Sequence, residues 1–125
     1  MDRHVAAALG RSQLIDLTTT GRKTGEHRRI EIFLHNLGGR LVISGVPSRE
    51  RTRAWLRNVE ANPSVTLHLK QGLQADVPAT ARVVTDTEER RELLKGVAAN
   101  WGRTDLDVMQ AYSPLIELSV EDYAG

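Results

Sequence analysis

The chain has 125 residues, with 17 Lys or Arg against 16 Asp or Glu, so its formal net charge is +1. This length fits a single domain with one core, here residues 1–125, and the balanced charge gives no overall attraction to nucleic acid. The absence of cysteine excludes disulfides, thiolate metal sites and a cysteine nucleophile. No apolar run approaches the ~20 residues of a membrane helix, and the N-terminal segment is too short and polar for a signal peptide. We therefore expect a cytoplasmic protein without stable membrane insertion.

Gly, Pro and Asn residues divide the first half of the chain into expected strands and a helix. Alternating apolar residues predict strands at 13–20 and 28–35, and a mostly apolar run predicts another at 40–46. Short turns join these strands, so they should form an antiparallel meander. From Ser48 the apolar spacing becomes helical, and this helix should end at Asn62-Pro63.

The next part of the chain predicts a second hairpin and a well-capped helix. Apolar residues alternate through 65–70 and again through 73–83. Pro78 should lie at a sheet edge or a bulge, because it has no N–H to donate. Overlapping capping boxes at 85–89 begin a helix with an apolar stripe, and Gly102 ends it.

A short helix from Thr104 to about Tyr112 and a strand at 114–120 complete the chain. The element order is therefore β-β-β-α-β-β-α-α-β. Strands joined mainly by hairpins imply a predominantly antiparallel sheet that closes into a small barrel, with helices at its periphery. The expected fold class is α+β.

A basic loop follows the first expected strand, in the run Thr18-Thr19-Thr20-Gly21-Arg22-Lys23-Thr24-Gly25. Its two glycines can bracket a turn whose N–H groups point inward as an anion-binding nest. Arg22 and Lys23, with Arg28 and Arg29 nearby, add guanidinium and ammonium donors that suit phosphate or several carboxylates. A solvated basic hairpin is the alternative interpretation, and residue types alone leave both open.

Other catalytic motifs are missing from the sequence. The order Gly21-Arg22-Lys23-Thr24 is not that of a nucleotide P-loop, and no Gly-x-Gly-x-x-Gly fingerprint occurs. The four histidines are scattered without a helical i, i+4 pair, so no metal site is expected. Ser44 and Ser48 lack the Gly-x-Ser-x-Gly frame of a nucleophile elbow.

Trp55 and Asn58 are three residues apart on the expected first helix, so they lie on nearby faces. Core packing and stacking against a bound ring are both open for Trp55, with packing favoured by its apolar neighbours. Trp101 and Tyr112, near the ends of the late helices, could line the mouth of a pocket, but packing is the favoured interpretation. Glu31 should face solvent or a polar cavity.

Several short motifs follow one another along the chain. In order they are Leu17-Thr18-Thr19-Thr20-Gly21-Arg22-Lys23-Thr24-Gly25, Arg28, Gly39-Arg40-Leu41-Val42-Ile43, Trp55, Asn58, Ala61-Asn62-Pro63 and Val65. On these residues the chain resembles the deazaflavin-dependent nitroreductase family and the related F420H2-dependent quinone reductases, over about residues 13–120. The resemblance implies a split β-barrel of the pyridoxamine-phosphate-oxidase/FMN-binding kind. It also implies binding of coenzyme F420, whose tail carries a phosphate and an oligoglutamate chain.

The resemblance assigns the coenzyme contacts to particular positions. Phosphate and tail carboxylates would be held by Arg22, Lys23, Thr24 and Arg28. The deazaflavin ring would lie along the loop after the third strand, formed by Ser44, Gly45, Val46 and Pro47. Trp55 and Asn58 would close the other side.

The implied activity is reduction of an electron-poor small-molecule acceptor, namely a quinone, a nitro compound or an activated alkene. Tyr112 is the candidate catalytic proton donor, and Ser44, Ser48 or water are alternatives. The chain has Val46 where nitro-reducing relatives have a serine. A non-catalytic F420 carrier, an FMN-binding barrel and a nucleic-acid or structural module are competing interpretations, and a homodimer is possible because related barrels commonly dimerise.

Overall fold

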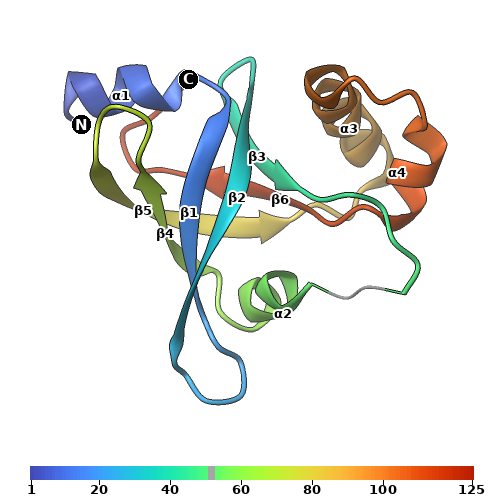
Figure 1. Ribbon diagram of the computed structural model, residues 1–125, viewed down its shortest axis with the longest axis horizontal. Helices are drawn as coiled ribbons and strands as arrows, with labels where there is room; N and C mark the ends of the chain where they lie inside the picture. Colours follow the sequence, from blue (N-terminus) through green and yellow to red (C-terminus); the bar gives the residue numbers. More distant parts are fainter. Residues whose placement is uncertain (51–52) are drawn as a thin grey trace.

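The computed structural model describes residues 1–50 and 53–125, and within these residues six strands close into an antiparallel barrel (Figure 1). The strand order around the barrel is β1-β2-β3-β6-β5-β4. The strands are β1 (Gln13–Thr20), β2 (His27–Leu37), β3 (Arg40–Ser44), β4 (Ser64–Leu69), β5 (Ala75–Val83) and β6 (Leu115–Ser119). The helices are α1 (Arg3–Leu9), α2 (Ala54–Ala61), α3 (Thr87–Trp101) and α4 (Leu106–Tyr112). The predicted antiparallel barrel with peripheral helices is confirmed.

The β1–β2 hairpin is long and reaches beyond the rest of the barrel (Figure 1). Its pairing runs from Gln13↔Leu34 to Thr20↔His27, whereas β4 pairs with β1 only from Asp16 to Thr18. The tip of the hairpin therefore has a strand partner on one side only. As a result the basic loop at 21–26 projects from the barrel, close to α2.

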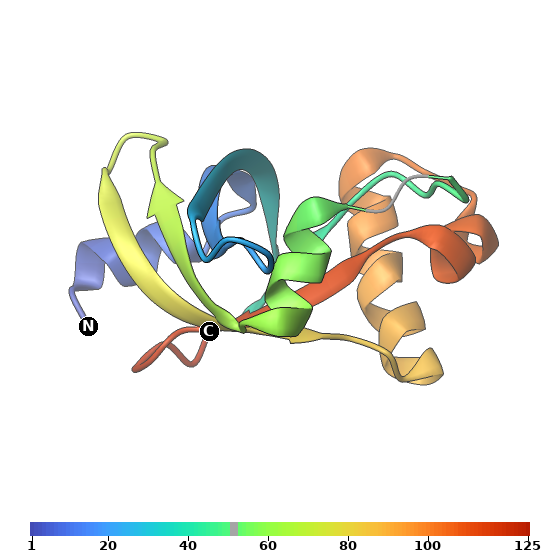
Figure 2. The ribbon, with the colours of Figure 1, turned by 90° about the horizontal axis from the view of Figure 1, so that it is seen from below.

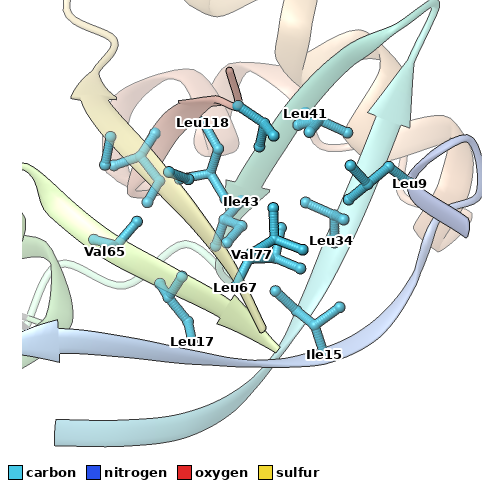
Figure 3. Close-up of a cluster of buried hydrophobic side chains, with 14 of the residues drawn as sticks. Leu9, Ile15, Leu17, Leu34, Leu41, Ile43, Val65, Leu67, Val77 and Leu118 are labelled. Carbon is cyan, nitrogen blue, oxygen red and sulfur yellow. The ribbon is translucent and has the colours of Figure 1, made fainter. Parts of the chain in front are cut away.

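The main core fills the inside of the barrel, where alternate residues of each strand point inward (Figure 3). Leu17, Ile43 and Leu67 come from three different strands and are fully buried. Burying each such side chain contributes about 1.5–3 kcal/mol relative to leaving it exposed. Trp55 and Val59 of α2 belong to the same cluster, so the core fixes the position of this helix.

A second, smaller cluster lies outside the barrel, where α3 and α4 cover the outer face of β3 and the start of β6. Val42 points away from the barrel interior into this cluster and meets Leu94, Val97 and Met109. Figures 1 and 2 show both helices on the same side of the barrel, away from α1. The strand β3 is therefore covered on both faces, as its mostly apolar sequence predicted.

Four charged side chains tie the start of α3 to the barrel. Arg40 Nε donates to Glu117 at 2.7 Å and its Nη2 donates to Glu89 at 2.7 Å. Arg82 Nη2 completes the network with bonds to Glu89 at 2.8 Å and to Glu117 at 2.6 Å. Arg82 and Arg40 together lower the pKa of Glu89 to about 2.

The bounds of two elements differ from the sequence prediction. The helix expected from Ser48 begins at Ala54, because Ser48 Oγ accepts a bond from the Glu50 N–H at 3.3 Å in a local turn and residues 48–50 are not helical. The remainder of its expected first turn, 51–52, lies outside the described residues. The strand expected to continue to Val46 ends at Ser44, since the Val46 carbonyl accepts a hydrogen bond from the Arg53 guanidinium and does not join the ladder.

The helix α1 was not predicted, although Asp2 supplies a capping signal. Asp2 Oδ1 accepts from the backbone N–H of His4 at 2.7 Å and of Val5 at 3.2 Å.

The edge position of Pro78 is confirmed, since it pairs with Thr66 of β4 in the half of β5 that β6 does not reach. In the described part of the chain no helix is long and apolar enough to cross a bilayer.

Candidate functional site

The basic loop between β1 and β2 is a hydrogen-bonded turn. Gly21 donates its N–H to the Glu26 carbonyl at 2.7 Å, and Gly25, at φ +74°, donates to the Gly21 carbonyl at 2.8 Å. The N–H of Glu26 bonds Thr24 Oγ1 at 3.2 Å. These N–H groups are used within the turn, so the expected anion-binding nest of backbone amides is not formed by them. The basic side chains are therefore the main anion-binding groups of the loop.

Asn58 of α2 joins the helix to this loop. Its amide is buried, with the residue 4% exposed, and Oδ1 accepts from the Arg22 N–H at 3.1 Å. Its Nδ2 donates to Thr19 Oγ1 at 3.0 Å. Both ends of the amide are therefore engaged by the β1 end and the loop. Asn58, assigned above to contact the coenzyme, holds the wall of the site in place through these bonds.

A cavity of about 390 Å³ lies between the loop and α2, and we call it the hairpin cavity. Its lining residues are Thr19, Gly21, Arg22, Lys23, Thr24, Arg28, Ile30, Ala54, Trp55 and Asn58. The structure thus brings together the four predicted tail-binding residues with Trp55 and Asn58. Arg22, Lys23 and Arg28 are exposed, and Arg28 Nη2 lies 3.4 Å from the Glu26 carboxylate. Because this ion pair is exposed, it is weak and an anionic ligand could displace it.

A neighbouring cavity of about 580 Å³, the β2–α2 cavity, shares Ile30, Ala54 and Trp55 with the hairpin cavity. Its other lining residues are Glu31, Ile32, Ser44, Gly45 and Arg53. The two cavities therefore adjoin along α2, with cations at one end and a mixed, partly apolar surface at the other. Trp55 is only 8% exposed, so it packs in the core and lines both cavities at once.

Not every predicted contact reaches these cavities. Ser44 and Gly45 line the β2–α2 cavity, but the adjacent Val46 and Pro47 line neither, and Val46 is 56% exposed. Ser44 Oγ donates to the Pro114 carbonyl at 2.6 Å, so its hydroxyl proton is already engaged. Tyr112 also lines neither of them and lies instead on a third cavity, between α2 and α4.

Sequence reasoning missed Arg53. Its side chain is buried, 9% exposed, and donates to the Val46 carbonyl. A Cβ at Gly45 would lie 3.0 Å from its Nη2, so Gly45 lets the guanidinium pass close to the backbone. Arg53 thereby fixes the path of the loop after β3. The only sequence signal was its place in the arginine-rich stretch before α2, which reads equally well as a solvated helix face.

A further hollow of about 440 Å³ lies on the outer face of β1, β4 and β5. Its wall carries the hydroxyls of Thr18, Thr66 and Thr80, and also Glu121. Among the described residues that line it there is no Lys or Arg. It therefore offers little to a polyanionic ligand, and the two adjoining cavities along α2 are the better candidate site.

The fold and the site together define a split-barrel protein with two adjoining cavities beside α2, one of which is lined by basic side chains. The sequence model for F420H(2)-dependent quinone reductase matches residues 2–115. The chain belongs to this F420H(2)-dependent quinone reductase family. It is accordingly an F420-dependent reductase, and its coenzyme is F420.

Solved structures agree on the fold. An F420-H2 dependent reductase, FDR-A, has a TM-score of 0.65 and 22% identity, covering 85% of this chain and 93% of that one. A FAD-binding protein from Mesorhizobium loti has a TM-score of 0.65 and 13% identity, covering 98% and 91%. A heme storage protein from Vibrio cholerae has a TM-score of 0.69 and 15% identity, covering 97% and 90%. At these identities the likeness establishes the split-barrel architecture alone.

The residues present fit F420. Three exposed cations in the hairpin cavity match the charge of a phosphate and glutamate tail. The β2–α2 cavity offers the apolar side chains of Ile30, Ile32 and Trp55 to a flat ring system. Because the basic cavity and the partly apolar cavity adjoin, one molecule with anions at one end and a ring at the other can occupy both.

Proposed function

We propose that the chain transfers a hydride from reduced F420 to an electron-poor organic acceptor, with a quinone as the first candidate and nitro compounds or activated alkenes as others. The observation that carries the proposal is the pair of adjoining cavities along α2, cationic at the hairpin loop and partly apolar at β2. The family description supports the quinone. Reduced F420, when bound, supplies a hydride from a ring carbon, because carbon replaces the N5 of a flavin.

In this proposal Arg22, Lys23, Thr24 and Arg28 hold the anionic tail. The guanidinium forks bind two oxygens at a time, the ammonium is a compact charge, and the threonine hydroxyl adds a neutral donor. Asn58 keeps Arg22 beside α2 through the bond to its N–H. The loop is thereby preorganised before the coenzyme arrives, which lowers the entropy lost on binding.

Ser44 and Gly45 line the path of the ring, and Val46 and Pro47 continue the same loop just outside the cavity. Trp55 closes the opposite wall. Arg53 holds the carbonyl of Val46, which fixes this loop while the Val46 side chain stays exposed. An exposed apolar side chain next to the cavity can cover a bound ring and exclude water from the acceptor. Ile30 and Ile32 present the remaining apolar surface from β2.

The reduced acceptor also needs a proton. The hydroxyl of Ser44 already donates to the Pro114 carbonyl, so it is poorly placed to give its proton away. Tyr112, the proposed donor, lies on the α2–α4 side of Arg53 and is 38% exposed. The proton comes either from Tyr112 or from solvent, and a Tyr112→Phe variant separates these two sources. If Tyr112 donates the proton, kcat of the variant should fall by about 10²-fold or more, whereas kcat should not change if the proton comes from solvent.

Fluorescence titration with F420 tests the binding part. The double variant Arg22→Ala with Lys23→Ala should weaken binding at least 100-fold, since two charge-assisted contacts of about 1.5–3 kcal/mol each are lost. The matched control removes an exposed arginine and lysine from α3, Arg91→Ala with Lys95→Ala, and should leave the affinity unchanged. Equal affinity in both variants would refute the assignment of the loop.

An acceptor panel tests the catalytic part. Wild-type protein loaded with reduced F420 is mixed with quinones, nitro compounds and activated alkenes, and coenzyme oxidation is followed by absorbance at its visible band. Quinones should react fastest. Coenzyme that binds but is oxidised by no member of the panel would support the carrier interpretation, and a flavin spectrum in the purified protein would support FMN binding.

A further inference from the structure

A third cavity, of about 350 Å³, lies between α2 and the end of α4, and we call it the α2–α4 cavity. Both helices lie on the side of the barrel that the loop after β3 crosses (Figures 1 and 2). Its lining residues are Arg53, Leu56, Arg57, Glu60, Arg90, Gln110, Ala111, Tyr112, Ser113 and Pro114. Arg53 lines this cavity and the β2–α2 cavity, so its side chain is a common wall between the two.

Among the described residues that line this cavity positive charge predominates, with three arginines against the carboxylate of Glu60. Glu60 lies 3.5 Å from Arg57, and both side chains of that pair are about half exposed. Arg90 has no carboxylate partner among the described residues. It donates to the carbonyls of Gln110 and Ser113 at 2.9 Å and of Val84 at 3.3 Å, and burial lowers its pKa. Three of its five N–H groups are bonded to carbonyls, and no carboxylate among the described residues neutralises its charge.

Ser113, one of the residues that line the cavity, has a buried hydroxyl without a hydrogen-bond partner among the described residues. Ser113 is 4% exposed, and its Oγ makes no hydrogen bond within the described part of the chain. The Oε1 of Gln110 also has no partner among the described residues, but it is an acceptor and would be satisfied by a donor and not by an anion. Buried polar atoms are nearly always hydrogen-bonded, and leaving one unpaired costs about 1–3 kcal/mol. A free hydroxyl donor near the Arg90 guanidinium, which has no carboxylate partner among the described residues, is the arrangement that an oxyanion would satisfy.

We propose that the α2–α4 cavity binds a carboxylate of the acceptor, whose reducible part lies in the β2–α2 cavity. This rests on the function proposed above. A carboxylate fits better than a phosphate dianion, because Glu60 on the α2 wall and the negative end of α4 on the other wall both oppose a second negative charge. Because Arg53 forms a wall of both cavities, the carboxylate and the reducible part of the acceptor would lie on either side of its guanidinium. The enzyme therefore prefers anionic, carboxylate-bearing acceptors over neutral ones of the same shape.

Binding of benzoate, compared with the neutral and isosteric benzamide, tests the cavity without the coenzyme. Benzoate should shift the backbone amide resonances of Tyr112 and Ser113 in the protein's nitrogen–proton correlation spectrum, and benzamide should not. Arg57→Gln should weaken benzoate binding at least fivefold, and Ser113→Ala should weaken it severalfold without unfolding, since it removes only an unpaired hydroxyl. Arg91→Gln makes the same charge change on the exposed face of α3, outside the cavity, and should leave benzoate binding intact.

The link to the acceptor is tested with two naphthoquinones that differ only in a propionate or a propionamide substituent. The wild type loaded with reduced F420 should show a KM at least fivefold lower for the propionate. This preference should disappear in Arg57→Gln and persist in Arg91→Gln. Equal effects of benzoate and benzamide would overturn the site itself, even if the coenzyme binds. Benzoate binding without any preference between the quinones would overturn the assignment to the acceptor and indicate a free carboxylate ligand.

Discussion

Asn58 is the residue through which α2 positions the basic loop, and its replacement by alanine should affect both folding and coenzyme binding. Asn58→Ala removes the bond to the Arg22 N–H, 3.1 Å, and the bond to Thr19 Oγ1, 3.0 Å. The amide is buried, with the residue 4% exposed, and Thr19 is 2% exposed, so water cannot easily replace the bond between these two side chains. The variant should therefore be less stable and have a less ordered loop.

The expected magnitude follows from the two lost bonds. A typical intramolecular hydrogen bond contributes about 1 kcal/mol net, and a buried group left unpaired adds about 1–3 kcal/mol. Asn58→Ala should therefore lower the free energy of unfolding by about 3 kcal/mol. Because Arg22 then has to be ordered by the coenzyme itself, we expect the Kd of F420 to rise about tenfold, which corresponds to about 1.4 kcal/mol.

Urea unfolding followed by tryptophan fluorescence measures the first effect, and fluorescence titration with F420 measures the second. The control is Asn62→Ala, which makes the same chemical change just beyond α2, where Asn62 Oδ1 accepts from the Ser64 N–H at 3.0 Å. It should cost about 1 kcal/mol and leave the Kd unchanged. The reasoning would be refuted if Asn58→Ala were no less stable than Asn62→Ala and bound F420 with wild-type affinity.

Three further predictions concern the scaffold. Burial lowers the pKa of His35 to about 4, so stability should fall as the pH drops below 6.5, by about 2 kcal/mol at pH 5, and His35→Gln, which cannot be protonated, should remove most of that decline in urea titrations. Glu89 has its pKa lowered to about 2 by Arg82 and Arg40, so the stability that its charge contributes is present above pH 4.5 and lost as the pH falls toward 2. The gap in melting temperature between wild type and Glu89→Gln should accordingly close over that range, and a gap that stays constant would count against the ion network. Gly102→Ala should destabilise the protein by about 1 kcal/mol, because Gly102 ends α3 at φ +65°, while Gly102→Asn should cost less.

Much of the fold could be predicted because the local signals agree with the tertiary packing. The strand at 13–20 is predicted to the residue, since every second side chain from Gln13 faces the interior. The helix that Gly102 ends has an apolar stripe, an N-cap and a left-handed C-cap, and each of these is a local sequence signal. The helix α2 was predicted too long at its N-terminal end. Its N-cap residue is Arg53, whose side chain makes no capping hydrogen bond and instead donates to the Val46 carbonyl, so no local sequence signal marks the start of the helix.

The candidate site was predictable where the side chains act directly, and not where they act through other residues. Arg22, Lys23 and Arg28 are adjacent in sequence to a turn, so their gathering at one cavity follows from the hairpin alone. Asn58 engages Arg22 across 36 positions of sequence, and no local pattern announces that bond. The displacement of Tyr112 from the β2–α2 cavity likewise depends on how α4 packs against the outside of the barrel.

The eight-residue helix α2 determines the geometry of all three cavities because its faces point in different directions. Trp55 and Asn58 lie three residues apart and face the barrel and the loop, whereas Arg57 and Glu60, also three apart, face α4. The core contacts of Trp55 and Val59 fix the rotation of the helix about its axis. A rotation that improved one cavity would misplace the residues of the other, so substitutions that loosen Val59 should weaken both F420 and benzoate binding, whereas those at Arg57 should affect benzoate alone.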